Sequence, residues 1–337
     1  MLEKKLHLEK ISSILVVRLD RLGDLLCTTP MLSALKVLFP KARLTLVVSP
    51  YTAHLVEGSP ILDEVLIYPR RKYGGHWPER VSFWYHFLNR SFDLALAPKS
   101  NLHPTQALLV WASRAPLRVG RAAKRRRWRR RLLHFCYNIL LPIHRPGYHE
   151  TEACLDLLRA LGLNPPRLPS WVIIKSWAQE EVEKRLLTLG LLGKPLWGLY
   201  FSNRRQSRSL SWEYLIKLGK CIQKAFPQFL PIVTCSPEDE KVLRERLPSS
   251  FVLFSTPHFQ TLGALLKHLQ FFITTDGGPS HLSAAVGTRT ITLFTGDEKH
   301  LKTWAPWGEK HFSLLVERSL PEELAREILS FLQKKAV

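Results

Sequence analysis

The sequence has little of what marks several common protein classes. Its five cysteines are odd in number and none forms a C-x-x-C pair, which excludes a disulfide framework or a zinc ribbon and predicts reduced, mostly buried thiols. No stretch reaches the roughly 18 uninterrupted apolar residues that a membrane span needs. The first residues, Met1 to His7, are charged and no apolar core follows them. We therefore expect no signal peptide and a cytoplasmic protein.

Common nucleotide and metal motifs are absent as well. The first β-branched run is followed by a loop, Asp20 to Asp24, whose single glycine is Gly23, so the G-x-G-x-x-G of a nicotinamide enzyme is missing. No G-x-x-x-x-G-K-[ST] segment occurs, which argues against a P-loop enzyme. No His, Cys, Asp and Glu cluster has metal-ligand spacing. The sequence thus predicts neither a cofactor nor a metal.

Acidic residues are scarce, with 28 Asp and Glu against 49 Lys and Arg and a net charge of +21. Ten of the basic residues lie between Arg114 and Arg131, with no acidic residue among them. The run from Lys124 to Arg131 precedes an aromatic and apolar stretch, a pattern typical of an element at an anionic membrane surface. A solvated loop or a site for nucleic-acid phosphates are alternatives. Nucleic acid is not expected as a partner, because no known nucleic-acid module accompanies the run.

Length and periodicity predict two α/β domains. A chain of 337 residues with 45% hydrophobic content can bury two cores, since single cores stop growing at roughly 250 to 300 residues. Short apolar strands alternate with helical patterns in both halves, which predicts parallel sheets covered by helices. A proline-rich linker at 164–169 separates them, and a capping box from Ser319 to Glu322 opens a final helix. We therefore predict domains 1–165 and 166–320 and a terminal helix 321–337. The predicted strands are 14–18, 44–48, 64–68, 93–97, 118–119, 196–201, 230–235, 252–255, 271–274 and 290–294.

The segment 274–287 reads T-T-D-G-G-P-S-H-L-S-A-A-V-G and has the layout of a phosphate site. A buried-looking strand runs into Gly277 and Gly278, and a helix of small residues follows. Glycines at such a turn let a ligand approach the backbone, and the positive end of a helix dipole favours an anion. Asp276 and His281 flank the turn with groups that can bind a sugar hydroxyl. The alternative is a tight turn in which Asp276 caps the helix.

A second loop of this kind follows the first strand, which is 14–18. It carries carboxylates at Asp20 and Asp24, so a second phosphate cradle is not expected there. In open α/β sheets, ligands bind outside the carboxyl ends of the strands. Both loops can therefore face one cleft if each belongs to its own sheet, and the two half-sites are then expected to make one active site.

Together the two segments resemble glycosyltransferase family 9, the heptosyltransferase-like enzymes of lipopolysaccharide assembly. The first is similar to that family's R-L-x-x-L-G-D loop and the second to its D-[ST]-G-P-x-H-L-A-A-A-x-G loop and helix. Further matches follow in order at 117–120, 149–163 and 293–297, with Trp304 and Pro306 behind them. The resemblance implies a glycosyltransferase B architecture, in which two Rossmann-like domains face a central cleft and the terminal helix often returns to the first domain. It also implies an inverting enzyme that moves a heptose from ADP-heptose to a lipopolysaccharide-core acceptor.

The resemblance assigns roles to individual residues. Asp24 takes the place of the family's general base, with Asp20 in reserve, and a helix N-cap is the alternative for Asp24. Arg208 stands where the family has a phosphate-binding lysine in a K-x-[WL]-P-x-E pattern, with Arg204 and Arg205 nearby. The whole donor set comprises Arg208, Asp276, Gly277, Gly278, Ser280, His281 and, for the ribose, Glu240.

The acceptor side departs from the family pattern. Residues 97–103, A-P-K-S-N-L-H, replace the family's D-x-x-G-x-x-[KR] loop. The residues expected to bind anionic groups of a glycolipid acceptor are Asp20, Lys99, His103, Arg118 and Arg121. A polyanion-binding protein on an inactive glycosyltransferase scaffold is the competing prediction.

Overall fold

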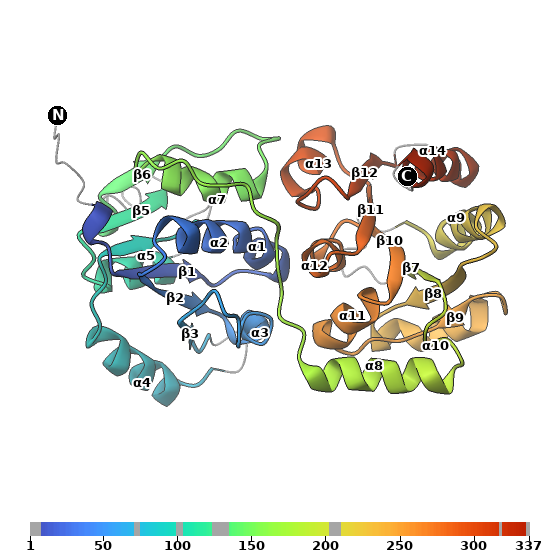
Figure 1. Ribbon diagram of the computed structural model, residues 1–337, viewed down its shortest axis with the longest axis horizontal. Coiled ribbons are helices and arrows are strands. Elements are labelled where there is room, and N and C mark those ends of the chain that lie inside the picture. The colour runs from blue at the N-terminus through green and yellow to red at the C-terminus, as the bar shows by residue number, and fades with distance from the viewer. Residues whose placement is uncertain are drawn as a thin grey trace. The chain divides into compact units, whose positions relative to one another are not determined.

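The protein consists of two compact units, Met1–Ile173 and Ile174–Val337. The computed structural model describes residues 8–70, 75–98, 104–122, 135–201, 210–316 and 319–334. Each unit contains one six-stranded sheet in which all neighbouring strands are parallel, with helices on both sides (Figure 1). The predicted α/β class is confirmed. In the described ranges, no helix is both long and apolar enough to cross a lipid bilayer.

The first sheet has the strand order β3-β2-β1-β4-β5-β6. Its central strand β1 is buried from Ile14 onward, as expected for a parallel strand covered on both faces. The strands are β1 (Ser13–Arg18), β2 (Arg43–Val48), β3 (Glu64–Ile67), β4 (Leu94–Leu96), β5 (Leu117–Arg121) and β6 (Ile139–Leu141). The helices are the short 3₁₀ helix η1 (Leu8–Lys10), α1 (Leu22–Leu26), α2 (Thr29–Leu38), α3 (Pro50–Ala53), α4 (Trp77–Leu88), α5 (Pro104–Ala112) and α7 (Glu150–Arg159).

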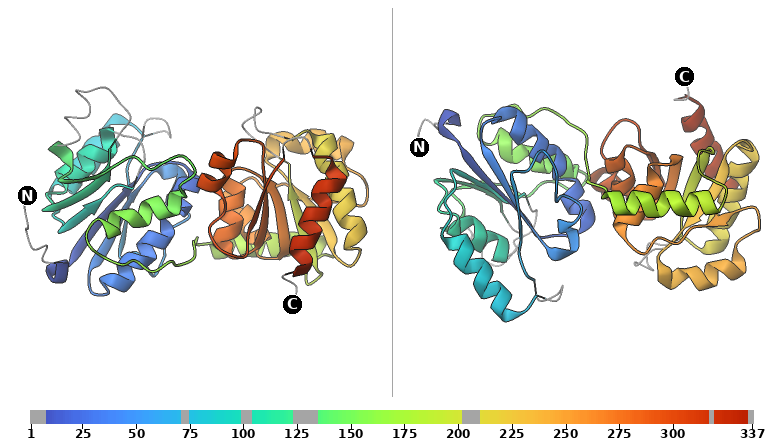
Figure 2. Two further views of the ribbon diagram at one scale, coloured as in Figure 1. Left: turned by 90° about the horizontal axis from the view of Figure 1, so that it is seen from above. Right: turned by 60° about the horizontal axis from the view of Figure 1, so that its bottom comes forward.

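Helices α4 and α5 cover one face of this sheet, and α2 and α7 lie together on the other (Figure 2). Phe87 of α4 and Leu109 and Val110 of α5 are buried in one core with Leu15 and Val17 of β1. Helix α4 adds an aromatic cluster, in which Phe83, Trp84 and Phe87 contact one another. Phe83 and Trp84 also contact Tyr68. The layer formed by α4 and α5 therefore has a packed inner side, and its outer side faces away from the sheet.

The second sheet has the order β12-β11-β10-β7-β8-β9. Trp197 of β7 is fully buried and stacks on Phe271 of β10, with ring centroids 5.4 Å apart. The strands are β7 (Leu196–Tyr200), β8 (Leu230–Thr234), β9 (Val252–Leu253), β10 (Leu269–Thr275), β11 (Arg289–Phe294) and β12 (Phe312–Leu315). The helices are α8 (Ser176–Thr188), α9 (Trp212–Ala225), α10 (Pro237–Arg246), α11 (Phe259–Leu266), α12 (Gly278–Val286), α13 (Glu298–Trp304) and α14 (Pro321–Lys334).

The units divide later in the chain than the predicted residue 165. The indole Nε1 of Trp171 donates to the hydroxyl of Ser33 at 2.9 Å, and the Ile173 N–H donates to the Leu55 carbonyl at 2.9 Å. These contacts hold the segment that follows the prolines to the first unit. Helix α7 already ends at Arg159, and the proline-rich segment after it does not end the domain.

The terminal helix α14 begins at Pro321, as predicted. The capping contact is shifted by one residue from the predicted box, since the Leu320 N–H donates to Glu323 Oε2 at 3.0 Å. The helix belongs to the second unit, where Leu324, Ile328 and Leu332 are buried in the same core as Leu215 and Leu218 of α9. The expectation that this helix returns to the first domain is corrected by that packing. Its apolar face is already covered by α9.

Every predicted strand is present, and the structure adds two edge strands, β6 and β12. Strand β6 has three residues, all half-buried, and its pairing with Val119, Gly120 and Arg121 defines it. Edge strands of this length carry no period that a sequence window can detect.

Candidate active site

The two predicted loops each follow a strand at the point where the strand order of its sheet reverses. In the first sheet this point lies between β1 and β4, and in the second between β10 and β7. Open α/β sheets bind ligands in the crevice outside the carboxyl ends of such strands. The residues that follow β1 and β10 therefore occupy the binding position of their own unit.

Arg18 at the end of β1 is the centre of a buried charge cluster. Its side chain is fully buried, and its Nη2 donates to Asp24 Oδ1 at 3.0 Å and to Glu150 Oε1 at 2.9 Å. Its Nε lies 3.5 Å from Asp20 Oδ2, without hydrogen-bond geometry. A buried guanidinium is tolerated only when it is paired, and here one cation is surrounded by three carboxylates. Neither Nε nor Nη1 has a hydrogen-bond partner in the part of the chain that the structure describes.

The Asp24 carboxylate is the member of this cluster that solvent reaches, with 24% of its side chain exposed. Its second oxygen, Oδ2, accepts the Arg21 backbone N–H at 3.3 Å. Asp24 thus lies inside α1 and contacts the helix start, while Arg21 occupies the N-cap position that was the alternative for Asp24. Burial raises the pKa of Asp24, although the Arg18 charge acts in the opposite direction. A partly exposed carboxylate with a raised pKa has the properties of a general base.

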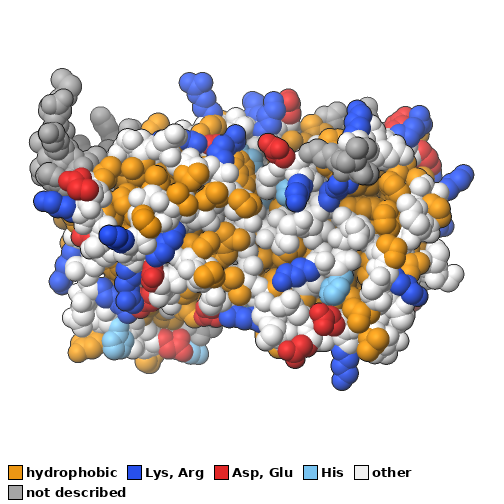
Figure 3. All heavy atoms as spheres, in the orientation of Figure 1, with side chains coloured by type: hydrophobic (Ala, Val, Ile, Leu, Met, Phe, Trp, Pro, Cys, Tyr) orange, Lys and Arg blue, Asp and Glu red, His pale blue; other side chains and the backbone are white. Residues whose placement is uncertain are grey.

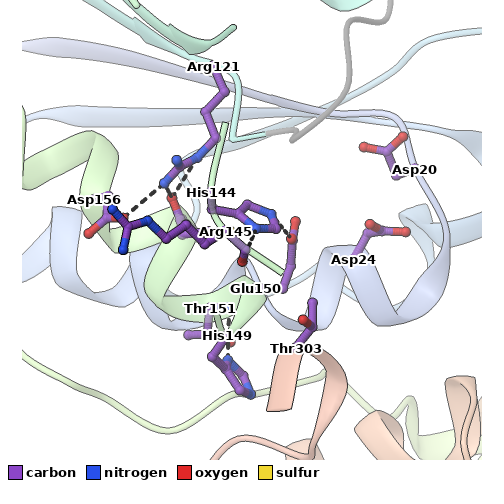
Figure 4. Close-up of polar contacts among 12 residues, drawn as sticks. Asp20, Asp24, Arg121, His144, Arg145, His149, Glu150, Thr151, Asp156 and Thr303 are labelled. Carbon is purple, nitrogen blue, oxygen red and sulfur yellow. Dashed lines mark hydrogen bonds and ion pairs between the residues drawn. The ribbon is translucent and has the colours of Figure 1, made fainter. Parts of the chain in front are cut away.

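Glu150 completes the cluster from α7, at the start of the second predicted family match in this unit. Its Oε2 lies 3.3 Å from His144 Nε2 (Figure 4). Burial by itself would raise the pKa of Glu150, but the hydrogen bond from His144 and the Arg18 charge lower it to about 2. Glu150 therefore stays ionised and holds Arg18 in place beside Asp24.

Asp20 is less accessible than the sequence suggested. It is 7% exposed, and its Oδ2 accepts from Nε2 of Gln106, which lies on α5, at 3.1 Å. This placement ties the β1 loop to α5. It leaves Asp24 as the more exposed of the two carboxylates.

Arg118 and Arg121, expected at the acceptor, contact the chain itself. Arg121 is 5% exposed, and it donates to the carbonyls of Ala153 and Pro142 and pairs with Asp156 (Figure 4). Arg118 donates to the carbonyls of Cys136 and Ala115 at 2.8 and 2.7 Å. Both lie on β5, where Arg121 reaches carbonyls of α7 and of the segment after β6, and Arg118 reaches carbonyls that precede β5 and β6. These contacts give both residues a structural role, and they occupy most of the side-chain donors of Arg121 but only two of the five of Arg118.

Three other predicted site residues lie outside the described residues: Lys99, His103 and Arg208. The basic segment from Lys124 to Arg131 also lies outside them. Strand β4 pairs with β1, and β7 pairs with β10. In the sequence, Lys99 follows β4 and Arg208 follows β7.

The second loop joins β10 to α12 through Gly277, which is the helix N-cap. Its backbone is extended, with φ 162°, and a Cβ added there would meet no atom nearer than Pro279 Cδ at 3.7 Å. Neither the backbone nor the packing of the described chain thus demands a glycine. A glycine at this position would let a ligand approach the backbone closely. The start of α12 supplies the dipole and N–H groups that suit an anion.

Asp276 is held by a histidine from the helix that follows β11. Its Oδ2 lies 2.8 Å from His300 Nε2, and the helix N-cap is Gly277 and not Asp276. His300 belongs to α13, whose N-cap Asp297 accepts its backbone N–H at 2.7 Å. The side chain of Asp276 is 11% exposed. A carboxylate with a fixed orientation thus lies directly after the end of β10. Such a group suits a sugar hydroxyl.

Two buried hydroxyls belong to the segments that follow β10 and β11. Ser280 of α12 is fully buried, and its Oγ has no partner among the described residues. Thr295 Oγ1, at the end of the neighbouring strand β11, is also buried and lacks a described partner. His281 is 5% exposed and contacts the Trp304 ring edge to face at 6.3 Å. Buried hydroxyls that the chain does not satisfy are candidates for ligand contacts.

Glu240, the candidate for the ribose hydroxyls, lies in the first turns of α10. Hydrogen bonds from Ser255 and Arg244 lower its pKa, and its side chain is 30% exposed. The carboxylate is ionised and accessible. No cluster of three or more His, Cys, Asp or Glu residues capable of holding a metal occurs among residues that the structure describes.

The sequence did not single out Arg18, His144 or His300 as site residues. Arg18 and Glu150 were both inside matched family segments, and the signal that could have identified Arg18 is a charged residue at the end of an otherwise apolar strand. His300 carried no signal, because its partner is 24 positions away.

Comparisons with known proteins agree with this geometry. The sequence model of glycosyltransferase family 9 (heptosyltransferase) matches residues 80–330. The chain is 26% identical over 305 residues to lipopolysaccharide heptosyltransferase 3 of Escherichia coli K12, over 85% of this chain and 83% of that protein.

Solved structures share the fold. A family 9 glycosyltransferase from Veillonella parvula superposes with a TM-score of 0.76 at 16% identity, over 97% of this chain and 90% of that one. The Escherichia coli ADP-heptose lipopolysaccharide heptosyltransferase II gives 0.72 at 15% identity, over 96% and 100%. The predicted glycosyltransferase B architecture is thereby confirmed. Because the family match covers well over half of its length, the chain belongs to glycosyltransferase family 9 (heptosyltransferase) and is a glycosyltransferase.

Proposed function

We propose that this glycosyltransferase transfers a heptose, with inversion, from ADP-heptose to an anionic lipopolysaccharide-core acceptor. The observation that carries the proposal is the Asp24 carboxylate, partly exposed at the switch point of the first sheet and held there by Arg18. Related proteins support the sugar and the nucleotide, since one bears the name lipopolysaccharide heptosyltransferase 3 and another the name ADP-heptose lipopolysaccharide heptosyltransferase II.

Asp24 is the general base in this proposal. It accepts the proton of an acceptor hydroxyl while that oxygen attacks the anomeric carbon of the donor sugar from the side opposite the diphosphate. Arg18 and Glu150 do not touch the substrates. They position Asp24, because Arg18 fixes one carboxylate oxygen and the negative charge of Glu150 keeps the Asp24 pKa from falling. Of the residues predicted at the acceptor, Asp20, Lys99 and His103 remain candidates.

The second unit stabilises the leaving group. As the bond between the anomeric carbon and the diphosphate oxygen breaks, the electron pair stays with the nucleotide diphosphate. Gly277, Gly278 and Ser280 at the start of α12 donate to that charge, and Arg208 adds a cation. Asp276, fixed by His300, accepts from a hydroxyl of the donor sugar. His281 and Glu240 complete the donor set.

We propose further that the enzyme works at the inner face of the inner membrane as a peripheral protein. The basic segment from Lys124 to Arg131 attracts anionic lipid, with about 1 kcal/mol for each basic residue near the surface. A polyanion-binding protein on an inactive scaffold would use the same charge. That alternative gives no reason to keep three carboxylates around a buried arginine, which is a costly arrangement unless it serves a site.

Nucleotide binding and turnover test the proposal. Thermal unfolding is measured with ADP, UDP and their sugars, and transfer is measured with ADP-heptose and a delipidated lipopolysaccharide core. We expect ADP to raise the melting temperature more than UDP, and the anomeric configuration to invert in the product. Equal responses to all nucleotides, with no transfer, would contradict an enzyme and favour the inactive scaffold.

A further inference from the structure

We propose that the outer side of the α4–α5 layer docks on an anionic lipid bilayer, with the exposed apolar residues of α4 entering the lipid interface. We call these residues the α4 stripe: Trp77, Val81, Tyr85 and Leu88. The inference rests on the proposed membrane setting of the acceptor but not on the chemistry of transfer. It differs from the basic segment, which attracts lipid through charge alone.

The α4 stripe follows one side of the helix. Its members are spaced by four, four and three residues, so their side chains share a face. They are 71%, 49%, 68% and 42% exposed, while Phe87 on the inner side is buried. Trp77, Val81 and Tyr85 also line a shallow depression with Trp84 and Arg80. Helix α4 thus has two apolar sides, and only one of them is used by the fold. Hydrophobic side chains reach the surface at the lower left of Figure 3, where α4 lies in Figure 1.

Exposed aromatic residues gather in this layer. Of the five large aromatic side chains that are exposed among the described residues, four lie in this layer or directly after the basic segment, and one lies in the second unit. Trp111 of α5 and Phe135 contact each other with ring centroids 5.9 Å apart. Leu108 on α5 is exposed as well. The five aromatic residues are Trp77, Tyr85, Trp111, Phe135 and, in the second unit, Trp177.

The charge of the residues around the α4–α5 layer indicates which partner docks there. Residues 65–92 contain five Lys and Arg and a single acidic residue, Glu79. Residues 94–149 contain twelve Lys and Arg and no acidic residue at all. The guanidinium of Arg80 lies over the Trp77 ring at 5.8 Å from its centroid, and Arg114 is exposed one turn beyond Trp111. An apolar surface with an excess of cations complements a bilayer whose surface is negative.

The composition favours lipid over a protein partner. Trp and Tyr have an apolar ring and a polar tip, and they prefer the boundary between hydrocarbon and water. Basic side chains beside them can extend toward headgroup phosphates. A helix with an apolar side, flanked by cations, lies in the plane of such an interface.

Vesicle binding tests the inference. Wild type and the double variant Trp77→Ser/Tyr85→Ser are sedimented with vesicles of phosphatidylcholine and phosphatidylglycerol that contain no glycolipid acceptor. Removing two aromatic rings from the interface should weaken partitioning on the order of a hundredfold. The control is Trp177→Ser on α8, which removes an aromatic side chain that is 48% exposed in the second unit. This control should bind as wild type does, and circular dichroism should show both variants folded.

Two further measurements separate this inference from the proposed activity. Brominated lipid should quench tryptophan fluorescence less in Trp77→Ser than in wild type, and turnover of a delipidated acceptor should be unchanged in the double variant. High salt should release the double variant more fully than wild type, because its remaining attraction is electrostatic. Equal vesicle binding by the double variant and wild type would overturn the inference. So would a wild-type protein that ignores vesicles and self-associates through the α4 stripe. Absence of turnover in every variant would count against the proposed function alone.

Discussion

The two units have the same sheet topology and use the same position in it for opposite chemistry. In each, the strand order reverses beside the first strand of the unit, and the candidate site lies at that point. The loop after β1 carries carboxylates around a buried cation, whereas β10 leads through Gly277 into a helix that carries the buried hydroxyl of Ser280. The fold therefore selects where a ligand lies. The side chains that follow the strand select whether that place moves a proton or binds an anion.

The units also differ in how the buried polar groups of their sites are paired. In the first, the charge of Arg18 is compensated by carboxylates of the chain itself, although its Nε and Nη1 have no hydrogen-bond partner among the described residues. In the second, Ser280 and Thr295 keep hydroxyls that the described chain does not satisfy. A ligand would satisfy them. We expect variants of the first site to change rates and pH dependence, and variants of the second to change affinity.

The largest effect should come from Asp24→Asn, which removes the base and keeps its shape. Loss of a general base costs about 10² to 10⁴ in rate, so kcat should fall in that range while ADP affinity stays near that of wild type. Calorimetry with ADP and a transfer assay measure the two. Asp63→Asn, a surface carboxylate paired with Lys36 in the same unit, is the matched control. Turnover close to wild type in Asp24→Asn would move the base elsewhere, first to Asp20.

Gly277→Ala should act on the other site alone. The added methyl group has space within the described chain, so stability should hold, but it would obstruct a close diphosphate. Overpacking of this kind costs about 1 to 3 kcal/mol, which is about 5- to 150-fold in ADP affinity. In contrast, a Cβ at Gly198 would clash with Leu269 in the core, so Gly198→Ala should lower the melting temperature. Unchanged ADP affinity in Gly277→Ala would mean that the glycine serves only the turn.

Glu150→Gln should shift the pH dependence of the first site. The charge of Glu150 raises the pKa of Asp24, so its removal should lower that pKa and move the acidic limb of kcat to lower pH. A weaker base also slows transfer, by about 3- to 10-fold at neutral pH. Glu152→Gln on the same helix, which loses partners at Arg159 and Arg167, should leave the limb in place. If the acidic limb of the kcat profile stays at the same pH in Glu150→Gln, Glu150 only supports the fold.

The smallest effect concerns acid stability. Glu150 has a pKa of about 2 in the fold and about 4.3 in an unfolded chain. Its contribution to stability is therefore complete above the unfolded value and is lost as pH falls through the folded one. Between pH 6 and pH 3, wild type should lose about 2 kcal/mol that Glu150→Gln does not lose. Urea unfolding at the two pH values measures this difference.

Asp24 provides the internal contrast for that experiment. Its pKa is raised in the fold, so its protonation as pH falls favours the folded state. Asp24→Asn should therefore remain at least as sensitive to acid as wild type. A smaller acid sensitivity in Asp24→Asn than in Glu150→Gln would reverse the assignment of the two carboxylates.

Local patterns were enough to predict much of the fold. Apolar strands alternating with helices predicted both sheets, and the run that leads into Asp276 and Gly277 predicted β10 and the helix that follows it. These signals span a few residues, and backbone propensities act over that range.

The errors fall where distant parts of the chain decide. Strand β6 exists because it pairs with β5, and α14 stays with the second unit because α9 covers its apolar face. Arg121 looked like a ligand for an anion, and it is instead bound by carbonyls of α7 and of the segment after β6. A side chain's partners depend on which elements pack against it, and the sequence around Arg121 contains none of them.

By itself, then, the sequence determined the α/β class, the two sites' places at strand ends, and the candidate base Asp24. Tertiary structure decided what surrounds that base. Arg18 and Glu150 are 132 positions apart, and their pairing exists only because β1 and α7 meet. Whether Asp24 titrates high or low depends on desolvation and on the charges around it, and both are created by burial. No local pattern contains that information.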